Sequence, residues 1–494
     1  MKDSDTFKII AAILTGALFL AFCFDLSKES VTDPSFLVLI VCTLLFTVLL
    51  KDRMGFGTIF YTMLAGMMVK LAYVMYTPVW CRQHDVVDFG AGEGHAAYIE
   101  YILSHKAIPD FDPRSVWAFF QPPLHHCISA VWMWLAIRLG LSEKHVYKNV
   151  QILPLVYMCL LMLFVYLICK ELNMRSKGVI AALLIASFHP VFILMSGSIN
   201  NDALAVMLSV AALYAAIRWY LYPTTQKIII LALFIGLGMC AKLSAALSAP
   251  AVGIVIVWKM IKDTNGFKNR QKVISYILEL IPFALIVFPL GLWWSIRNKI
   301  LFDMPPGYIP EVGEHVERYG FVPTILDIRT ASPFLYMKAN GFAYDEYNLL
   351  LAALKSALFG EGDFAALPPV VTILGWILFA AGVISAVVCI VSLVATCADK
   401  EAGPDDGLKI LLCATVVTFI AAFAAFALKG ANLSAMDFRY ASPVVVPFSI
   451  FTGLYCDRLL SKGRKMAGAL VMSCCILFAL SSGLFYITAG VFGA

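Results

Sequence analysis

Acidic and histidine side chains are concentrated in one short stretch of the chain, and such a stretch can carry acid–base chemistry. His84, Asp85 and Asp88 are followed closely by Glu93 and His95. The stretch comes directly after an apolar run, so we expect these groups at a membrane surface, where partial burial raises the pKa of a carboxylate toward neutral pH. A carboxylate in that state can act as a general base. The alternative is a solvated loop with local ion pairs.

Most of the histidines lie in the same region. Residues 80–149 contain six of the eight: His84, His95, His105, His125, His126 and His145. A metal site built from His84, Asp85, His95, His125 and His126 is a second hypothesis. The spacing does not support it, because no histidine pair lies four residues apart and no zinc-type pattern is present. We therefore expect no metal and no other cofactor.

Basic side chains at the ends of other apolar runs are suited to a phosphate group. Lys242 lies between two short apolar runs, Arg297 follows two tryptophans, and Arg439 precedes Tyr440. A lysine inside the membrane marks a functional site by default, and the arginine fork fits phosphate oxygens. The competing explanations are snorkelling of the lysine to the headgroups and an ordinary interfacial belt of aromatic residues.

Asn201 and Asp202 stand at the head of a further apolar run. Both residue types are strong N-caps, so the simplest expectation is that one of them caps the helix that follows. The alternative is a polar contribution to the same site, since this segment is expected on the same side of the membrane as the basic residues.

The composition points to a membrane protein with many spans. Of the 494 residues, 61% are hydrophobic and 14% are charged, against roughly 45–50% and about 25% in soluble domains. The mean hydropathy of +0.84 excludes a soluble enzyme on a single anchor. The net charge of +5 comes from short basic clusters, which argues against a nucleic-acid partner.

We expect an all-α polytopic membrane protein with about thirteen transmembrane helices, each spanning about 30 Å of hydrocarbon. The candidate spans are 7–24, 34–50, 56–79, 150–169, 178–195, 203–221, 228–241, 245–261, 273–294, 367–397, 408–428, 441–460 and 466–489.

One further apolar segment, 121–139, begins with two prolines and two histidines. Lysine and arginine favour cytoplasmic loops, and the basic clusters fall on one side of the membrane only if this segment does not cross it. We therefore expect an interfacial or re-entrant helix here and an amphipathic helix over 94–106. The N-terminus is then cytoplasmic in the plasma membrane, the C-terminus is outside, and the acidic loop 398–407 is inside.

This topology leaves two long extracytoplasmic segments, 80–149 and 295–366, which together hold sixteen of the 32 carboxylates. We found no repeat of fixed period and no detachable soluble part. The chain is interpreted as one membrane domain over 1–494, with 80–149 as the catalytic loop.

Taken in order, these motifs resemble the GT-C membrane glycosyltransferases, in particular the protein mannosyltransferase and aminoarabinose transferase group. The matching stretches are His84-Asp85, Gly94-His95, Gln121-Pro122-Pro123-Leu124, Asn201-Asp202, Gly236-x-Gly238 with Lys242, Trp294-x-x-Arg297-Asn298 and Arg439-Tyr440. The group usually has Asp-Glu before the aromatic residue of its amphipathic helix, whereas this chain has Gly92-Glu93.

The resemblance implies transfer of a sugar from a polyprenyl-phosphate carrier to a lipid, glycan or protein acceptor at the outer membrane surface, with inversion. It implies Asp85 as the base, with Glu93 second and Asp88 third. The residues expected to bind substrate are His84, His95, Gln121, His125, His126, Asn201, Asp202, Lys242, Arg297, Arg439 and Tyr440. Among these, Lys242, Arg297 and Arg439 would neutralise the departing phosphate.

Three other functions remain open. A transporter or flippase of a lipid-linked sugar would bind its substrate near the midplane, where Lys70 and Glu279 are charged exceptions within the spans. A glycan polymerase or ligase would use the same carrier and differ only in the size of donor and acceptor. A scaffold would leave the histidine and carboxylate loop idle.

Overall fold

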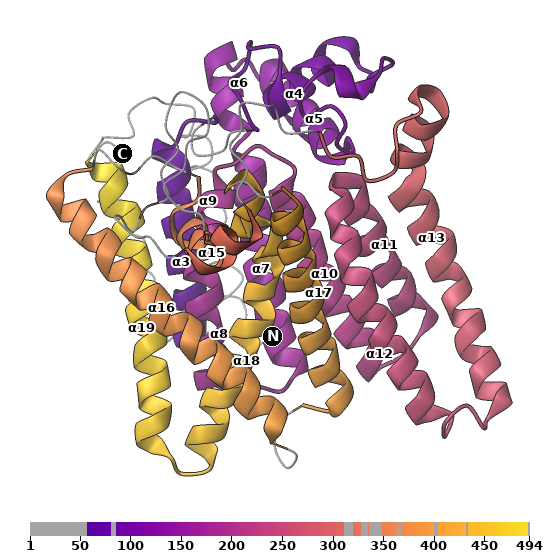
Figure 1. The fold of residues 1–494 in the computed structure, drawn as a ribbon, viewed down its shortest axis with the longest axis vertical. Coiled ribbons are helices and arrows are strands. Elements are labelled where there is room, and N and C mark those ends of the chain that lie inside the picture. The colour runs from indigo at the N-terminus through magenta and orange to yellow at the C-terminus, as the bar shows by residue number, and fades with distance from the viewer. Residues whose placement is uncertain are drawn as a thin grey trace, which may run out of the picture.

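The computed structural model describes residues 57–492, apart from 81–84, 311–319, 328–333, 335–347, 362–363, 365–366, 400–403 and 431–432. Helices joined by turns make up this described part (Figure 1). The predicted spans 7–24 and 34–50, together with His84, lie outside the described residues.

The helices that correspond to predicted spans are α3 (Gly57–Tyr76), α7 (Ile152–Glu171), α8 (Ser176–Phe188) with α9 (Pro190–Ser196), α10 (Asp202–Leu221), α11 (Thr225–Ala241), α12 (Ser248–Asp263), α13 (Arg270–Phe302), α16 (Pro369–Ala398), α17 (Asp406–Gly430), α18 (Val445–Ser461) and α19 (Lys465–Val491). The remaining helices are α4 (Gly94–His105), α5 (Leu124–Arg138), α6 (Glu143–Asn149), α14 (Phe321–Leu326) and α15 (Leu349–Phe359). The 3-10 turns are η1 (Pro113–Ser115), η2 (Leu243–Leu247), η3 (Leu433–Met436) and η4 (Phe438–Val444).

Nine helices among the described residues are long and apolar enough to cross a membrane, or up to ten if the bent pair α8 and α9 is one span. The predicted all-helical, multi-pass architecture is thereby confirmed. The count of thirteen is not confirmed, since two of the spans are outside the described residues and α11 has only 17 residues. The ninth span is longer than predicted: α13 continues past residue 294 to Phe302, which places Arg297 on a helix.

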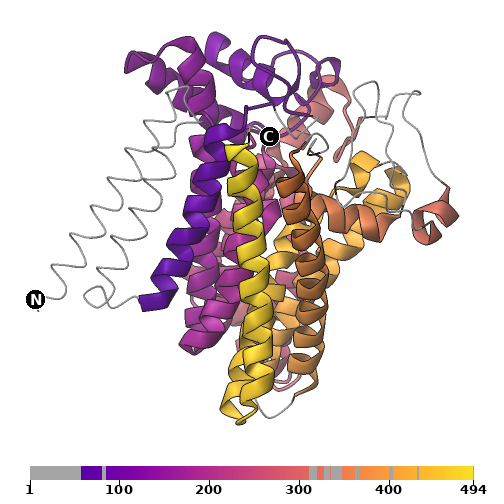
Figure 2. The same cartoon turned by 90° about the vertical axis from the view of Figure 1, so that its left-hand side faces the viewer.

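The two ends of the bundle differ in what covers them. Helices α4, α5 and α6 lie together over one end, and the α12–α13 and α18–α19 turns lie at the other (Figure 1). The view turned by 90° shows the same arrangement (Figure 2). At 15 residues, α5 is too short to span a bilayer. The expectation of an interfacial helix in 121–139 agrees with this position.

The acidic segment between α16 and α17 lies at the end that carries the basic turns. Asp399 pairs with Arg458 and Lys462 at 2.5 and 3.1 Å, and Asp405 pairs with Lys262 at 2.6 Å. The predicted placement of this acidic loop beside the basic clusters is therefore explained by direct charge pairing.

The two charged exceptions within the spans have structural partners. The chain bends by 51° between α8 and α9, because Pro190 cannot donate a backbone hydrogen bond. Two carbonyl oxygens at this bend accept hydrogen bonds from side chains. That of Ser187 accepts from Lys70 Nζ, and that of Phe188 accepts from Ser482 Oγ. Glu279 accepts from Trp219 Nε1 at 3.0 Å. Both charged groups thus serve the fold.

Helices α8 and α18 pack closely because glycines face each other. A Cβ atom on Gly453 would lie 2.4 Å from the carbonyl oxygen of Gly178, and one on Gly178 would lie 2.6 Å from that of Gly453. Small residues let helix backbones approach closely within a membrane.

We predict that the two ends react separately with a membrane-impermeant thiol reagent. Cysteines introduced at the exposed residues Asp110, between α4 and η1, and Lys268, between α12 and α13, should be labelled from opposite sides. Intact cells and inverted vesicles give the two measurements, with the parent chain as background. Labelling of both positions from one side would contradict this topology.

Candidate functional site

Asp85 is held in place by the backbone at the start of α4. The N–H groups of His95 and Ala96 donate to the carbonyl oxygens of Asp85 and Val86 at 3.2 and 3.1 Å. The turn closes because Gly94 has φ of +79°, and a Cβ atom there would lie 2.6 Å from the Val86 oxygen. Only glycine fits such a position without strain. The sequence Gly94-His95 therefore fixes the distance between Asp85 and His95.

The carboxylate of Asp85 lies between a cation and an imidazole. Its Oδ1 atom is 3.3 Å from Arg439 Nη1, and its Oδ2 atom is 3.6 Å from His95 Nε2. The side chain of Asp85 is 13% exposed. Partial burial beside a histidine is the environment that the sequence predicts for a base, whereas the ion pair with Arg439 was not predicted.

Arg439 is surrounded by carboxylates from several segments. Besides Asp85, it lies 3.4 Å from Glu361, 3.7 Å from Asp437 and 3.8 Å from Asp202. Its own side chain is 4% exposed. Asp437 also accepts the backbone N–H of Arg439 at 2.8 Å and so caps η4. We call the set Asp85, Asp202, Glu361, Asp437, Lys242 and Arg439 the charged cluster.

Glu361 and Asp437 were not among the predicted site residues. Asp437 is adjacent to the predicted Arg439-Tyr440 motif and could have been added from that position alone. Glu361 gave no comparable signal, because it follows α15 in a segment without a recognised motif.

Lys242 pairs with Asp202 and does not snorkel to the surface. Its Nζ atom lies 2.5 Å from Asp202 Oδ1 and 5.2 Å from the centre of the Tyr440 ring. Lys242 forms the C-cap of α11, and Asp202 begins α10. Two helix ends are thus joined by one ion pair.

The simple capping expectation for Asn201 and Asp202 is wrong. Asn201 occupies the N-cap position of α10 but makes no side-chain cap hydrogen bond. Its amide donates to the Ala241 carbonyl at 2.7 Å and to Gln121 Oε1 at 3.4 Å. The Asp202 side chain is engaged by Lys242. Asn201 and Asp202 thus connect the start of α10 with the end of α11 and with Gln121, which precedes α5.

Two histidines extend the contacts of the Asp85 side chain. His95 Nδ1 and His126 Nε2 are 2.8 Å apart, and His126 stacks on Tyr98 with ring centroids 4.1 Å apart. Burial lowers the pKa of His126 well below its usual range. One hydrogen bond therefore joins the two rings, with one nitrogen donating and the other accepting. Asp85 thus contacts His95, and His95 in turn contacts His126.

His125 faces a different partner. Its Nε2 atom lies 2.8 Å from the Ile199 carbonyl oxygen, and burial lowers its pKa to about 4. His125 and His126 are both fully buried. In this geometry they support α5 and Asp85 and offer no accessible nitrogen to a substrate.

Arg297 lies apart from the charged cluster. Its guanidinium donates to the Pro109 carbonyl and, at 2.7 Å, to Asn298 Oδ1, and it stacks on Trp294 at 5.0 Å. Within the described residues it makes no ion pair. Of the predicted cations, Lys242 and Arg439 are therefore paired with carboxylates, whereas Arg297 ties α13 to the loop before η1.

The two alternative bases are on the open surface. Glu93 is exposed and makes no cap hydrogen bond at the start of α4. Asp88 is also exposed, and its Oδ1 atom accepts the Phe89 N–H at 2.9 Å. Neither contacts the charged cluster in the described part of the chain, so the geometry favours Asp85.

The geometry of the histidines does not favour the metal hypothesis. Across the ranges that the structure describes, no group of three or more His, Cys, Asp or Glu side chains is arranged to hold a metal ion. His95 and His126 direct nitrogens at each other, at 2.8 Å, and not toward a common point. The geometry of those two rings fits a hydrogen bond between them better than joint coordination of a metal ion.

The central part of the chain matches a known family. Residues 121–294, about a third of the chain, match the model of the family described as dolichyl-phosphate-mannose-protein mannosyltransferase. The predicted resemblance is confirmed over this segment, which contains Gln121, Asn201, Asp202 and Lys242. No curated protein sequence matches the chain.

Two solved structures illustrate the likeness at the level of coordinates. The first is the oligosaccharyltransferase AglB from Archaeoglobus fulgidus in complex with an inhibitory peptide and a dolichol-phosphate, at 12% identity and a TM-score of 0.48, covering 88% of this chain and 56% of that one. The second is ArnT from Cupriavidus metallidurans bound to undecaprenyl phosphate, at 13% identity and a TM-score of 0.49, covering 86% and 76%. The chain thus spans little more than half the length of AglB.

We predict that Arg439→Gln strongly destabilises the protein and that a second change relieves this. Removing one partner of a buried ion pair costs about 3–5 kcal/mol, and here several carboxylates lose their counter-charge. In detergent, the double variant Arg439→Gln/Glu361→Gln should show a smaller decrease in melting temperature than Arg439→Gln alone.

The matched control is Arg138→Gln, at the same end of the bundle, where the exposed arginine lies over the Trp134 ring. Its melting temperature should stay at the parent value. Equal losses in Arg439→Gln and Arg138→Gln would show that Arg439 is not the centre of the cluster.

Proposed function

We propose that this chain, whose residues 121–294 match the dolichyl-phosphate-mannose-protein mannosyltransferase family, is an inverting glycosyltransferase. It moves a sugar from a polyprenyl-phosphate carrier to an acceptor at the extracytoplasmic membrane face. The observation that carries the proposal is that Asp85 is held beside Arg439 and His95 at the end of the bundle covered by α4, α5 and α6.

The charge distribution supports the proposed orientation. The turns rich in lysine and arginine lie at the end opposite to α4, α5 and α6 (Figure 1), and short basic loops favour the cytoplasm. The charged cluster then faces the extracytoplasmic side. Donor and acceptor meet there, and the sugar–phosphate bond supplies the energy without a nucleotide.

In the proposed reaction, Asp85 accepts the proton of an acceptor hydroxyl as its oxygen attacks the anomeric carbon. The bond from that carbon to the phosphate oxygen breaks on the opposite side, and the carrier phosphate leaves with the bonding electrons. Attack opposite to the leaving group inverts the configuration. A base of this kind contributes about 10²–10⁴-fold to the rate.

The remaining charges divide into two roles. Arg439 orients Asp85, because its guanidinium pairs with the carboxylate at 3.3 Å. Arg297 donates to Pro109 and Asn298, but no described carboxylate balances its charge, so it would add a positive charge for the carrier phosphate. Lys242, with 12% of its side chain exposed, adds a second positive charge next to Asp202.

We predict that Asp85→Asn abolishes transfer, with a loss of at least about 10²-fold, while the folded protein is still produced, because Arg439 keeps three other carboxylate partners. The measurement is mass spectrometry of lipids from cells that depend on the variant, in which the polyprenyl-linked sugar should accumulate. The sugar on that lipid identifies the donor.

Glu93→Gln is the matched comparison, since it removes an exposed carboxylate close by in the chain. It should retain activity. Loss of activity in Glu93→Gln and full activity in Asp85→Asn would move the base to Glu93. Full activity in both variants would rule out the proposed enzymatic function. Appearance of the lipid-linked sugar on the other leaflet without transfer would favour a flippase.

We predict a smaller effect for His126→Phe, which keeps the ring stacked on Tyr98 but removes the hydrogen bond to His95. Transfer should fall about tenfold, since one such bond is worth about 1.4 kcal/mol. The same lipid assay reports the change. Wild-type activity would show that His126 serves packing alone.

A further inference from the structure

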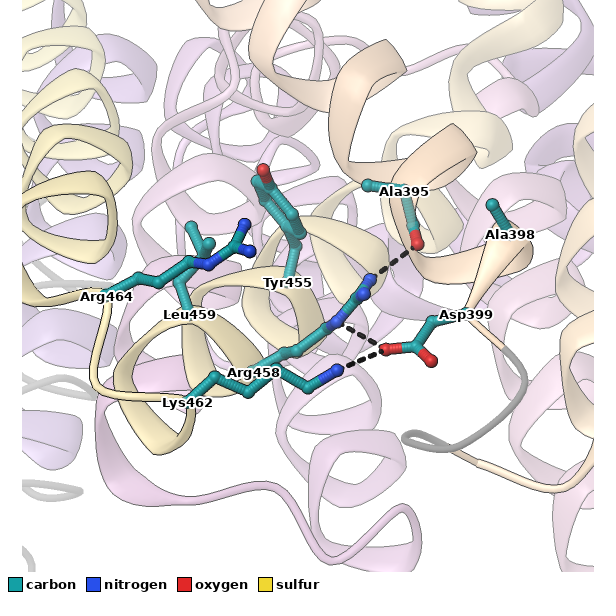
Figure 3. A pocket seen from close by; sticks show the side chains of 8 residues that line it. All are labelled: Ala395, Ala398, Asp399, Tyr455, Arg458, Leu459, Lys462 and Arg464. Atoms are coloured by element: carbon teal, nitrogen blue, oxygen red, sulfur yellow. Dashed lines mark hydrogen bonds and ion pairs between the residues drawn. The ribbon is translucent and has the colours of Figure 1, made fainter.

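A cavity lies at the end of the bundle opposite to the charged cluster. It has a volume of about 350 Å³ and is formed where α16 and α18 end and α19 begins (Figure 3). Its polar lining consists of Arg458, Lys462, Arg464, Asp399 and Tyr455. The cavity is at the lower limit of the volumes of small-ligand sites, roughly 300–1,000 Å³, so it can hold a compact polar group.

Among the described residues that line this cavity, positive charges outnumber negative ones. Asp399 Oδ2 lies 2.5 Å from Arg458 Nε and 3.1 Å from Lys462 Nζ, and Arg458 Nη1 donates to the Ala395 carbonyl at 2.7 Å. One carboxylate therefore serves two cations. Arg464 lines the same cavity, and its side chain makes no hydrogen bond or ion pair with the residues that the structure describes.

Apolar side chains surround the same position. Val391 and Val394 of α16 are 49% and 59% exposed. They lie one helical turn before Ala395 and Ala398, which line the cavity, and therefore on the same face of α16. Met466, two residues after Arg464, is 89% exposed. A molecule bound here contacts positively charged side chains in the cavity and exposed apolar side chains beside it.

We propose that this cavity binds the phosphate headgroup of an anionic glycerophospholipid of the adjacent leaflet. The acyl chains lie along the exposed face of α16. Arginine forks bind phosphate oxygens through paired, charge-assisted hydrogen bonds, and basic pockets between membrane helices on the cytoplasmic side are suited to anionic headgroups. The phosphate supplies the counter-charge that Asp399 alone does not provide.

Native mass spectrometry of the purified full chain in detergent tests the proposal. Phosphatidylglycerol and phosphatidylcholine with identical acyl chains are titrated separately. We expect one phosphatidylglycerol to bind at least tenfold more tightly than phosphatidylcholine. Arg464→Gln should reduce this preference at least threefold, and Lys462→Gln/Arg464→Gln should abolish it. Because Arg464 is exposed, the single variant keeps the fold, which its melting temperature verifies.

The matched control is Lys268→Gln, which removes an exposed positive charge from the α12–α13 turn at the same end of the bundle. It should bind phosphatidylglycerol like the parent chain. Equal binding of the two lipids, or equal losses in the Lys268 and Arg464 variants, would overturn the proposal. Displacement of phosphatidylglycerol by millimolar inorganic phosphate would show a site for free anions and reject the lipid.

Discussion

Arg439 is almost fully buried, and four carboxylates share its charge. Asp85 precedes α4, Asp202 begins α10, Glu361 follows α15 and Asp437 precedes η4. A buried charge is tolerated only when partners repay the loss of hydration. These segments must therefore meet at one point or leave charges unpaired, and this requirement fixes Asp85 relative to the bundle.

The same constraint acts on the backbone inside the bundle. Where α8 ends at the bend before Pro190, carbonyl oxygens would remain unsatisfied in a medium without water. Lys70 and Ser482 satisfy them. Broken helices in transporters expose such groups to a substrate, whereas here side chains of the protein itself occupy them. The break is thus explained by structure and does not require transport.

The charged cluster and the cavity at the opposite end differ in the charges of the described residues that form them. In the charged cluster, carboxylates outnumber Lys242 and Arg439, so the end proposed to carry out transfer is rich in proton acceptors. In the opposite cavity the cations outnumber Asp399. This asymmetry matches the preference of basic residues for the cytoplasmic side and separates the proposed reaction from the proposed lipid site.

The sequence by itself determined the membrane class and the apolar helices of the bundle, and it singled out Asp85, Lys242 and Arg439 as candidates, because hydropathy and charge placement are local properties. Only the tertiary structure decided which groups meet. Asp85 and Arg439 are 354 positions apart, and Glu361 enters their cluster without any motif. Pairing over such distances depends on how helices pack, and a linear pattern does not encode it.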